Sequence, residues 1–268
     1  MPELPEVETV ANGVHERTHG QTIRSVWTSN KPQTFKSPPD QIADMLTGSR
    51  IERVHRVGKT IVMDITRSRK PAQFLVHLGM SGRLLVSTPD TPVPPHTHAI
   101  LTLSGGREIR FVDPRRFGRL SIAESPYEGP GREPLTIPLE DFIALFRHRK
   151  TPIKAALLNQ SLLHGVGNIY ADESLFRAGI RPRRQAGRLT HAELARLRTA
   201  LIDVLQHAIK LGGSSVSDYV DAEGVAGFFQ LEHRVYMRTG QPCTVCGTAI
   251  QRITLAGRGT HFCPHCQH

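Results

Sequence analysis

The stretch "CTVCGTAIQRITLAGRGTHFCPHC", residues 243–266, contains every cysteine of this 268-residue chain. The four cysteines follow the spacing C-x2-C-x16-C-x2-C and are Cys243, Cys246, Cys263 and Cys266. Each C-x2-C pair can bind one side of a tetrahedral zinc ion, and a β-hairpin between the pairs would bring them together. Two disulfides or four unrelated thiols are the alternatives, but disulfides are rare in the cytosol, where we expect this chain. The spacing therefore predicts one structural zinc ion, since four thiolates leave no open position for water.

Arg258 lies between the two cysteine pairs, within "GRGTHFC" (257–263). An isolated loop arginine is most often solvated. This arginine belongs to a basic segment, because four arginines and one glutamate lie between Leu231 and the C-terminus. A phosphate contact is therefore at least as good an interpretation of Arg258 as a solvated side chain.

The chain before the zinc segment has a helical pattern from Leu139 onward. Thr190 and Glu193 predict a capping box, and the apolar stripe that follows ends at a pair of glycines. Nearer its start, "LLHGVGNIYADESLF" (162–176) places two glycines before Asn168. Glycine allows tight turns and leaves backbone N–H groups accessible to a phosphate at a helix start, although a plain interhelical turn would use the same residues.

The first half of the chain has a different pattern. Residues 22–123 contain short runs rich in β-branched residues, separated by turn signals, which is typical of a sandwich or barrel. A helix precedes them, because Pro5 suits a helix start and apolar residues in 7–14 recur with a helical period. The Pro- and Gly-rich stretch 124–138 then indicates a linker between two domains.

The composition favours a polyanionic partner. The formal net charge is +10, and five arginines against two acidic residues lie between Arg107 and Arg119. Such a clustered surplus most often serves nucleic-acid binding.

The chain is 38% hydrophobic, which allows a sizeable core. No apolar run approaches the ~18 residues of a membrane span, and the acidic start is unlike a secretory signal. We therefore expect a cytosolic protein without a membrane segment.

Two apolar residues stand at turns, Met80 in "LGMSGRL" and Phe117 in "DPRRFGR". Core packing is the usual role of both residue types. The alternative is a wedge, because proteins that flip a base out of the duplex fill the gap with apolar or arginine side chains. The opening "MPELPEVETV" is also partly unexplained, since helix initiation accounts for Pro5 but not for Pro2 and Glu3.

Together these segments resemble the formamidopyrimidine-DNA glycosylase/endonuclease VIII family of base-excision repair enzymes. The resemblance is carried by "MPELPEVET", "HLGMSG", "DPRRFG", "GVGNIYADESLFRAGI", "GGSSVSDYV" and the cysteine segment. These motifs are distributed along essentially the whole chain, from its first residues to its last cysteines. It implies an α+β fold with an N-terminal β-sandwich domain that includes an N-terminal helix (1–130). A helical domain with a helix–two-turn–helix motif (131–230) and a zinc-binding β-hairpin (231–268) would follow. The opening resembles the branch of the family that acts on oxidised purines.

The resemblance also implies the catalytic residues. After removal of the initiator methionine, the secondary amine of Pro2 becomes the nucleophile of a bifunctional glycosylase/AP lyase. Glu3 is similar to the general acid that assists sugar-ring opening, and Glu6 matches a second, supporting carboxylate. Lys59, in "RVGKTIV", matches the lysine that binds phosphate and assists β-elimination. Arg258 matches the zinc-finger arginine assigned to δ-elimination.

Further residues are implied to contact DNA. The void-filling residues would be Met80, Arg115 and Phe117. The phosphate ligands and other residues near the DNA would be Asn168, His96, Arg149 and Lys154. The resemblance also puts a loop that caps the flipped base at residues 212–229, which we expect to be mobile because of its glycines.

The prediction is therefore a DNA glycosylase/AP lyase that excises oxidised purines from duplex DNA. Its partner would be double-stranded DNA with oxidised bases or abasic sites, and its state a monomer. One rival is a relative that prefers pyrimidines. The other is a zinc-ribbon module that binds DNA or RNA without catalysis, and a covalent protein–DNA adduct would separate it from the enzyme.

Overall fold

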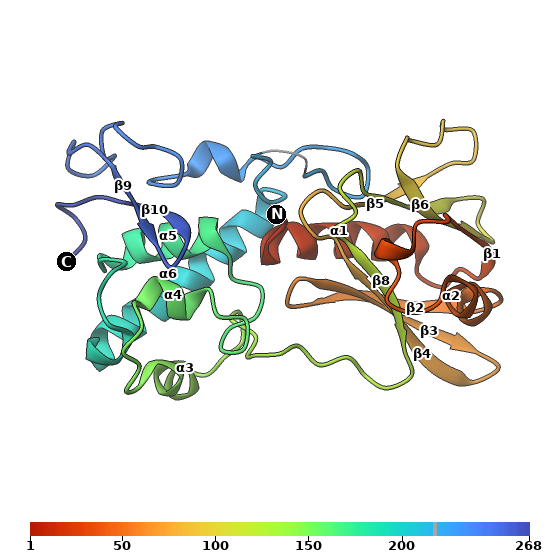
Figure 1. Ribbon diagram of the computed structural model, residues 1–268, viewed down its shortest axis with the longest axis horizontal. Helices are drawn as coiled ribbons and strands as arrows, with labels where there is room; N and C mark the ends of the chain where they lie inside the picture. The colour runs from red at the N-terminus through yellow and green to blue at the C-terminus, as the bar shows by residue number, and fades with distance from the viewer. Residues whose placement is uncertain (217–218) are drawn as a thin grey trace. The chain divides into compact units, whose positions relative to one another are not determined.

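Figure 1 shows the computed structural model, which describes residues 1–216 and 219–268. The chain forms two compact units. The first unit combines Met1–Glu128 with Leu211–Phe228, and the second combines Gly129–Lys210 with Phe229–His268. Across the described residues, no helix has the length and apolar character that crossing a membrane requires.

Two antiparallel four-stranded sheets form the body of the first unit in its described part. One has the strand order β1-β6-β7-β5 and the other β2-β3-β4-β8. The strands are β1 (Ile23–Thr28), β2 (Arg50–Val57), β3 (Thr60–Arg67), β4 (Lys70–His77), β5 (Arg83–Ser87), β6 (Thr97–Leu103), β7 (Glu108–Val112) and β8 (Arg119–Ala123). Alternate residues face one shared core, as do the buried Ile61, Met63 and Ile65 of β3. The expected β-sandwich is thereby confirmed.

Helix α1 (Leu4–Thr18) packs against β2, β3 and β5 and completes this core. The fully buried residues of its inner face are Val7, Val10, Ala11 and Val14. The predicted apolar stripe is confirmed. It explains why this segment forms a helix, because a helix places all four apolar side chains on the face that packs against the sheets. Undocking the helix would expose these four side chains to water. The helix begins at Leu4, one residue before Pro5.

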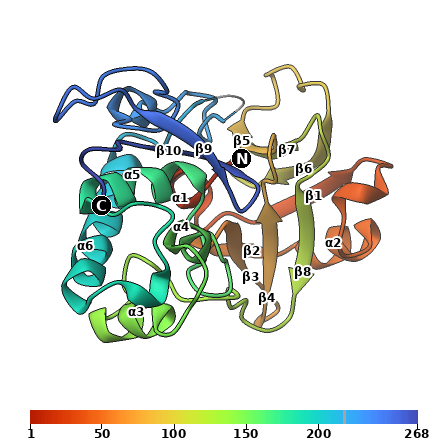
Figure 2. The same cartoon turned by 60° about the vertical axis from the view of Figure 1, so that its left-hand side comes forward.

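The second unit consists of helices and a C-terminal hairpin (Figure 2). Its main elements are α3 (Leu139–Phe146), α4 (Ile153–Leu157), α5 (Asn168–Ala178), α6 (His191–Lys210), β9 (Gln251–Leu255) and β10 (Arg258–Phe262). Short 3-10 turns cover Pro32–Thr34 in the first unit and Ala186–Arg188 and Phe229–Glu232 in the second. α5 packs against both α6 and β10. The capping box predicted before α6 is present, since the Thr190 N–H donates to the Glu193 carboxylate at 2.8 Å and the Glu193 N–H donates to the Thr190 hydroxyl at 3.2 Å.

Two elements are not among the short β-branched runs that predict strands in residues 22–123. Helix α2 (Pro39–Leu46) interrupts the strands, because Pro39 suits a helix start and Ile42 and Leu46 bury one face. Strand β8 is an additional strand, which follows "DPRRFG" and pairs with β4.

Residues 211–228 pack with the first unit, although the expected domain limits group them with the helices. Tyr219 and Ala222 are buried in the core of the first unit, and the Val86 N–H of β5 donates to the Ala222 carbonyl at 2.8 Å. The later part of the expected capping loop is thus anchored to a sheet edge. Ser217 and Asp218, which also belong to that loop, lie outside the described residues.

Candidate functional site

Residues 2–6 are buried in the first unit. Pro2, Glu3 and Glu6 are buried, whereas Met1 is half exposed. Glu3 is the N-cap of α1, and its backbone N–H donates to Glu6 Oε2 at 2.8 Å. Pro2 therefore has a defined position beside Glu3, which chain ends usually lack. Removal of Met1 would convert the Pro2 nitrogen from an amide to a secondary amine at this position.

Glu6 joins this N-terminus to the segment that follows α6. Its other oxygen, Oε1, accepts a hydrogen bond from the Ser214 N–H at 2.8 Å. Gly213 lies directly against it, because a Cβ on Gly213 would be 2.9 Å from Glu6 Cγ. Since one carboxylate accepts from backbone donors on both sides, Glu6 fixes the geometry around Glu3.

Lys59 lies in the turn between β2 and β3, beside Thr60, which pairs with His77 of β4. Burial lowers the pKa of His77, and the nearby charges of Lys59 and Arg119 lower it further. His77 is therefore neutral near pH 7, and the two cations set the local potential. Such a site attracts a phosphate group.

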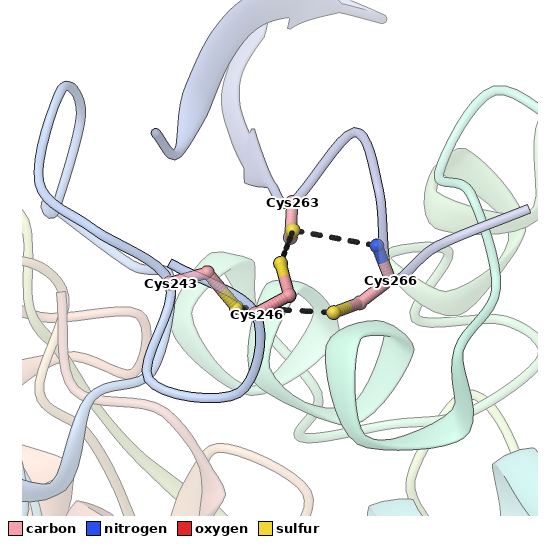
Figure 3. Close-up of side chains that lie close together, drawn as sticks. All are labelled: Cys243, Cys246, Cys263 and Cys266. Atoms are coloured by element: carbon pink, nitrogen blue, oxygen red, sulfur yellow. Dashed lines mark hydrogen bonds between the residues drawn. The ribbon is translucent and has the colours of Figure 1, made fainter. Parts of the chain in front are cut away.

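The four cysteines of the second unit point toward one another (Figure 3). Their sulfur atoms all lie within 4.8 Å of one another. The Cys243–Cys266 and Cys246–Cys263 sulfur distances are 3.9 Å and 3.5 Å. A tetrahedron with Zn–S bonds of ~2.3 Å has edges of ~3.8 Å. The residues fit one structural zinc ion, as predicted, and none of the four forms a disulfide.

Two side chains hold the turn that carries Arg258. Arg258 is exposed at the start of β10. The carbonyl of the next residue, Gly259, accepts hydrogen bonds from Lys154 Nζ and Asn168 Nδ2, both at 2.9 Å. Asn168 is the first residue of α5, so the hairpin turn is tied to both α4 and α5.

The ammonium group of Lys154 is buried inside the second unit. It lies 2.7 Å from Asp172 Oδ1 and 2.8 Å from the Thr260 hydroxyl. A buried lysine requires such a partner, because an unpaired charge in the protein interior is costly. The resemblance places Lys154 near the DNA, and in this structure its ammonium group supports the hairpin from within the second unit.

Two adjacent acidic residues of α5, neither of them predicted as functional, organise the zinc segment. Asp172 accepts a hydrogen bond from the His261 N–H at 2.9 Å, in addition to its pairing with the buried lysine. Glu173 accepts from the backbone N–H groups of residues 234–236. Burial raises the pKa of Glu173, and these N–H donors oppose that shift. The signal for both residues is a pair of acids inside an otherwise buried helix, in "YADESLF".

The three predicted void-filling residues lie in loops of the first unit. Met80, between β4 and β5, is 40% exposed, and Phe117, between β7 and β8, is 48% exposed. The Arg115 guanidinium lies over the Phe117 ring, 4.9 Å from its centroid. Core packing, the ordinary role of methionine and phenylalanine, therefore does not describe either side chain.

The two remaining predicted contacts are on the surface. His96 precedes β6, is exposed and has a positive φ of 65°. Arg149 is exposed after α3, and its Nε donates to the Leu145 carbonyl. Both side chains are accessible to a phosphate.

Family models match most of the chain. Residues 1–120 match the formamidopyrimidine-DNA glycosylase N-terminal domain, and residues 130–220 match the formamidopyrimidine-DNA glycosylase H2TH domain. Residues 240–268 match the zinc finger found in FPG and IleRS.

Individual relatives match over their full length. The formamidopyrimidine-DNA glycosylase of Solibacter usitatus is 45% identical over 273 residues, covering 100% of this chain and 99% of the relative. The structure of the Lactococcus lactis Fpg with DNA containing an abasic site has a TM-score of 0.88 and 35% identity, and 99% of each chain is covered. The Thermus thermophilus Fpg structure has a TM-score of 0.85 and 41% identity, covering 99% of this chain and 98% of that one.

Proposed function

The chain belongs to the formamidopyrimidine-DNA glycosylase family, it is a DNA glycosylase for oxidised purines, and we propose that Pro2 supplies its nucleophile. The observation that carries the proposal is the buried N-terminus, in which Pro2 lies beside Glu3 and Glu6 holds the Glu3 N–H. AP lyase activity is the norm of the family. Solved relatives from Lactococcus lactis bind DNA with Fapy-dG or an abasic site, which supports both activities for this chain.

The first step replaces the bond between base and sugar by a bond to the protein. Once Met1 is removed, the Pro2 nitrogen attacks C1′, and the base leaves with the electron pair of the C1′–N bond. An α-amino group titrates near ~8, so a useful fraction is unprotonated at neutral pH. Glu3 donates a proton to the ring oxygen as the C1′–O4′ bond opens. The nitrogen loses its own proton, and the product is an iminium ion that joins Pro2 to the opened sugar.

The iminium ion then drives strand cleavage. Its positive charge accepts the electron pair left when C2′ loses a proton, and the 3′ phosphate departs in β-elimination. Lys59 would bind a phosphate at this stage, since it lies in the electropositive turn beside β4. A second elimination releases the 5′ phosphate, where Arg258 would neutralise the departing charge.

Borohydride trapping tests the nucleophile. Wild-type protein with zinc bound, incubated with an 8-oxoguanine:cytosine duplex and borohydride, is expected to form a covalent adduct, because reduction converts the iminium ion into a stable amine. Mass spectrometry of the digested adduct should locate the added mass on the peptide that begins with Pro2. A matched protein with a short N-terminal extension keeps that nitrogen as an amide and should form no adduct. Failure of wild-type protein to form an adduct, or an adduct on a lysine, would rule out the Pro2 mechanism.

Arg258→Ala is expected to shift cleavage products from δ- to β-elimination. The δ product should fall at least ~10-fold, because a cation aimed at a departing phosphate stabilises the transition state. Denaturing gels that resolve the two 3′ ends measure the ratio. Arg252→Ala, which removes another exposed arginine of the same hairpin, should leave the ratio unchanged. Unchanged products in Arg258→Ala would remove this residue from the mechanism.

The remaining residues are proposed to grip DNA. Asn168, His96 and Arg149 would bind phosphates, and the wedge of Met80, Arg115 and Phe117 would fill the gap left by the flipped base. The zinc ion supplies no chemistry beyond ordering the hairpin. We place the enzyme in the bacterial cytosol at the nucleoid, because its DNA repair relatives are bacterial. We also propose that it acts as a monomer.

Excision of oxidised pyrimidines is a second candidate activity. It is favoured by a Lactococcus lactis relative, 34% identical, whose structure contains DNA with an oxidised pyrimidine. Single-turnover excision of 8-oxoguanine and of an oxidised pyrimidine from the same duplex sequence decides between the two preferences. Faster excision of the pyrimidine would overturn the purine assignment.

A further inference from the structure

A fully buried carboxylate, that of Asp113, lies where two loops of the first unit meet. Its Oδ1 accepts hydrogen bonds from the Ser81 hydroxyl at 2.6 Å and from the Arg115 N–H at 3.3 Å. Its Oδ2 accepts a hydrogen bond from the Gly118 N–H at 2.7 Å. One carboxylate therefore joins the loop between β4 and β5 to the loop between β7 and β8.

The backbones of the same two loops lie in close contact. A Cβ on Gly79 would be 2.5 Å from the Phe117 carbonyl carbon and 2.6 Å from the Gly118 nitrogen. Gly79 also has a positive φ of 65°, a conformation that favours glycine. The loops thus have a fixed relative position, and Asp113 supplies the polar part of their connection.

Asp113 is also anchored through its own backbone. His98, buried on β6, contacts the Asp113 carbonyl through Nε2 at 3.0 Å and the Ser29 hydroxyl through Nδ1 at 3.0 Å. The backbone of Asp113, which carries the carboxylate, is therefore fixed to the sheet that contains β1, β6 and β7. A carboxylate suits its place because it only accepts hydrogen bonds, and all three groups around it donate.

The side chains that project from this connection are the three proposed void-filling residues. Met80 precedes Ser81, and Arg115 and Phe117 lie in the turn whose two ends bind Asp113. A wedge must hold its shape while it competes with the base for the space in the stack. Exposed side chains on loosely connected loops would lose conformational freedom on insertion, which weakens binding of the flipped state.

We propose that Asp113 is a positioning residue that fixes Met80, Arg115 and Phe117 as one rigid wedge. It acts through Ser81 and the backbone of the following turn, and it contacts neither the DNA nor the reacting atoms. The inference rests on the proposed function, because it takes the void-filling role of the three residues as given.

Asp113→Asn is expected to lower single-turnover excision of 8-oxoguanine from duplex DNA about 10- to 100-fold. The amide keeps the size of the side chain, but its NH2 group would face one of the donors that now face a carboxylate oxygen. Cleavage of an abasic site in single-stranded DNA should change less than ~2-fold, since there is no stack to open. Asp90→Asn makes the same charge change on an exposed residue between β5 and β6 and should alter neither rate.

A combined variant separates positioning from a general structural role. If Asp113 acts through the wedge, adding Asp113→Asn to Met80→Ala/Phe117→Ala causes no further loss of duplex excision. The proposal would be overturned if Asp113→Asn lowered duplex excision as much in the Met80→Ala/Phe117→Ala protein as in the wild-type protein. It would also be overturned if Asp113→Asn lowered cleavage of single-stranded abasic DNA as much as it lowers duplex excision. Wild-type excision by Met80→Ala/Phe117→Ala would reject the void-filling role and this inference with it. A missing borohydride adduct would instead reject the Pro2 chemistry.

Ser81→Ala is the second variant, to be used if thermal unfolding shows that Asp113→Asn does not fold. It removes only the hydroxyl that donates to the carboxylate at 2.6 Å. Duplex excision should fall about 10-fold, the lower end of the effect expected for one lost hydrogen bond to a charged group, with single-stranded cleavage unchanged. Wild-type duplex excision by a folded Ser81→Ala protein would overturn the proposal.

Discussion

Glu3→Gln should lower the release of 8-oxoguanine from duplex DNA about 10³-fold, which is within the range that general acid catalysis contributes. Glutamine matches the size of glutamate but cannot donate a proton to the sugar oxygen. The backbone N–H of residue 3 still binds Glu6, so the helix start and the position of Pro2 are retained. Cleavage of a preformed abasic site should fall much less, because its sugar is already partly ring-opened. Single-turnover rates on the two substrates measure the difference.

The control for this prediction comes from the same helix. Glu16, also on α1, has a side chain that is 73% exposed, and Glu16→Gln makes the same chemical change away from the N-terminus. It should leave both rates unchanged. If Glu3→Gln slowed both substrates equally, Glu3 would be acting on the Pro2 nucleophile or on folding, and its assignment as the acid for ring opening would be withdrawn.

The parts of this molecule that follow local rules are predictable from its sequence. The cysteine spacing predicts a compact metal site because each C-x2-C pair is a local turn, and the sulfur atoms do converge. The inner face of α1 and the capping box of α6 depend on residues three or four positions apart, and both are confirmed. Helix α2 also has a local signal, with Pro39 at its start and Ile42 and Leu46 on one face.

The connections between distant segments have no such signal. Nothing near Glu6 indicates that its carboxylate binds Ser214, more than 200 residues later. The role of Asp113 is similarly hidden, since its position in "DPRRFG" is that of an ordinary turn aspartate until Ser81 is found beside it. The Gly259 carbonyl likewise gains its partner Lys154 only when the hairpin packs on α4. Hydrogen bonds of this kind satisfy groups that folding has buried, so they depend on the tertiary fold rather than on the local sequence.

Cys263→Ser should abolish specific DNA binding while the first unit stays folded. Cys263 is completely buried, and the core around it is small: Phe176, Val235, Cys243 and Ile250. So little apolar surface cannot order the hairpin without the metal, because binding of a structural zinc ion supplies the folding free energy of such segments. Arg258 would then lose its position at the start of β10, and the Gly259 carbonyl would lose its fixed place against α4 and α5. We expect the dissociation constant for abasic-site DNA to rise at least ~100-fold, measured by titration of the full-length protein at fixed salt.

His265→Ala is the matched control for the zinc site. His265 is exposed and lies between Cys263 and Cys266, so His265→Ala removes an imidazole beside the site without removing any of the four sulfur ligands. The zinc content of His265→Ala should remain one ion per chain, with unchanged affinity for DNA, because four sulfur atoms already complete the tetrahedron. In Cys263→Ser the α1 and β-sheet unit should retain its cooperative unfolding, followed through Trp27 on β1. Wild-type affinity in a Cys263→Ser protein that has lost zinc would show that the hairpin does not hold the DNA. Phosphate binding would then have to come from the helix–turn region around Asn168 and from the β-sheet unit.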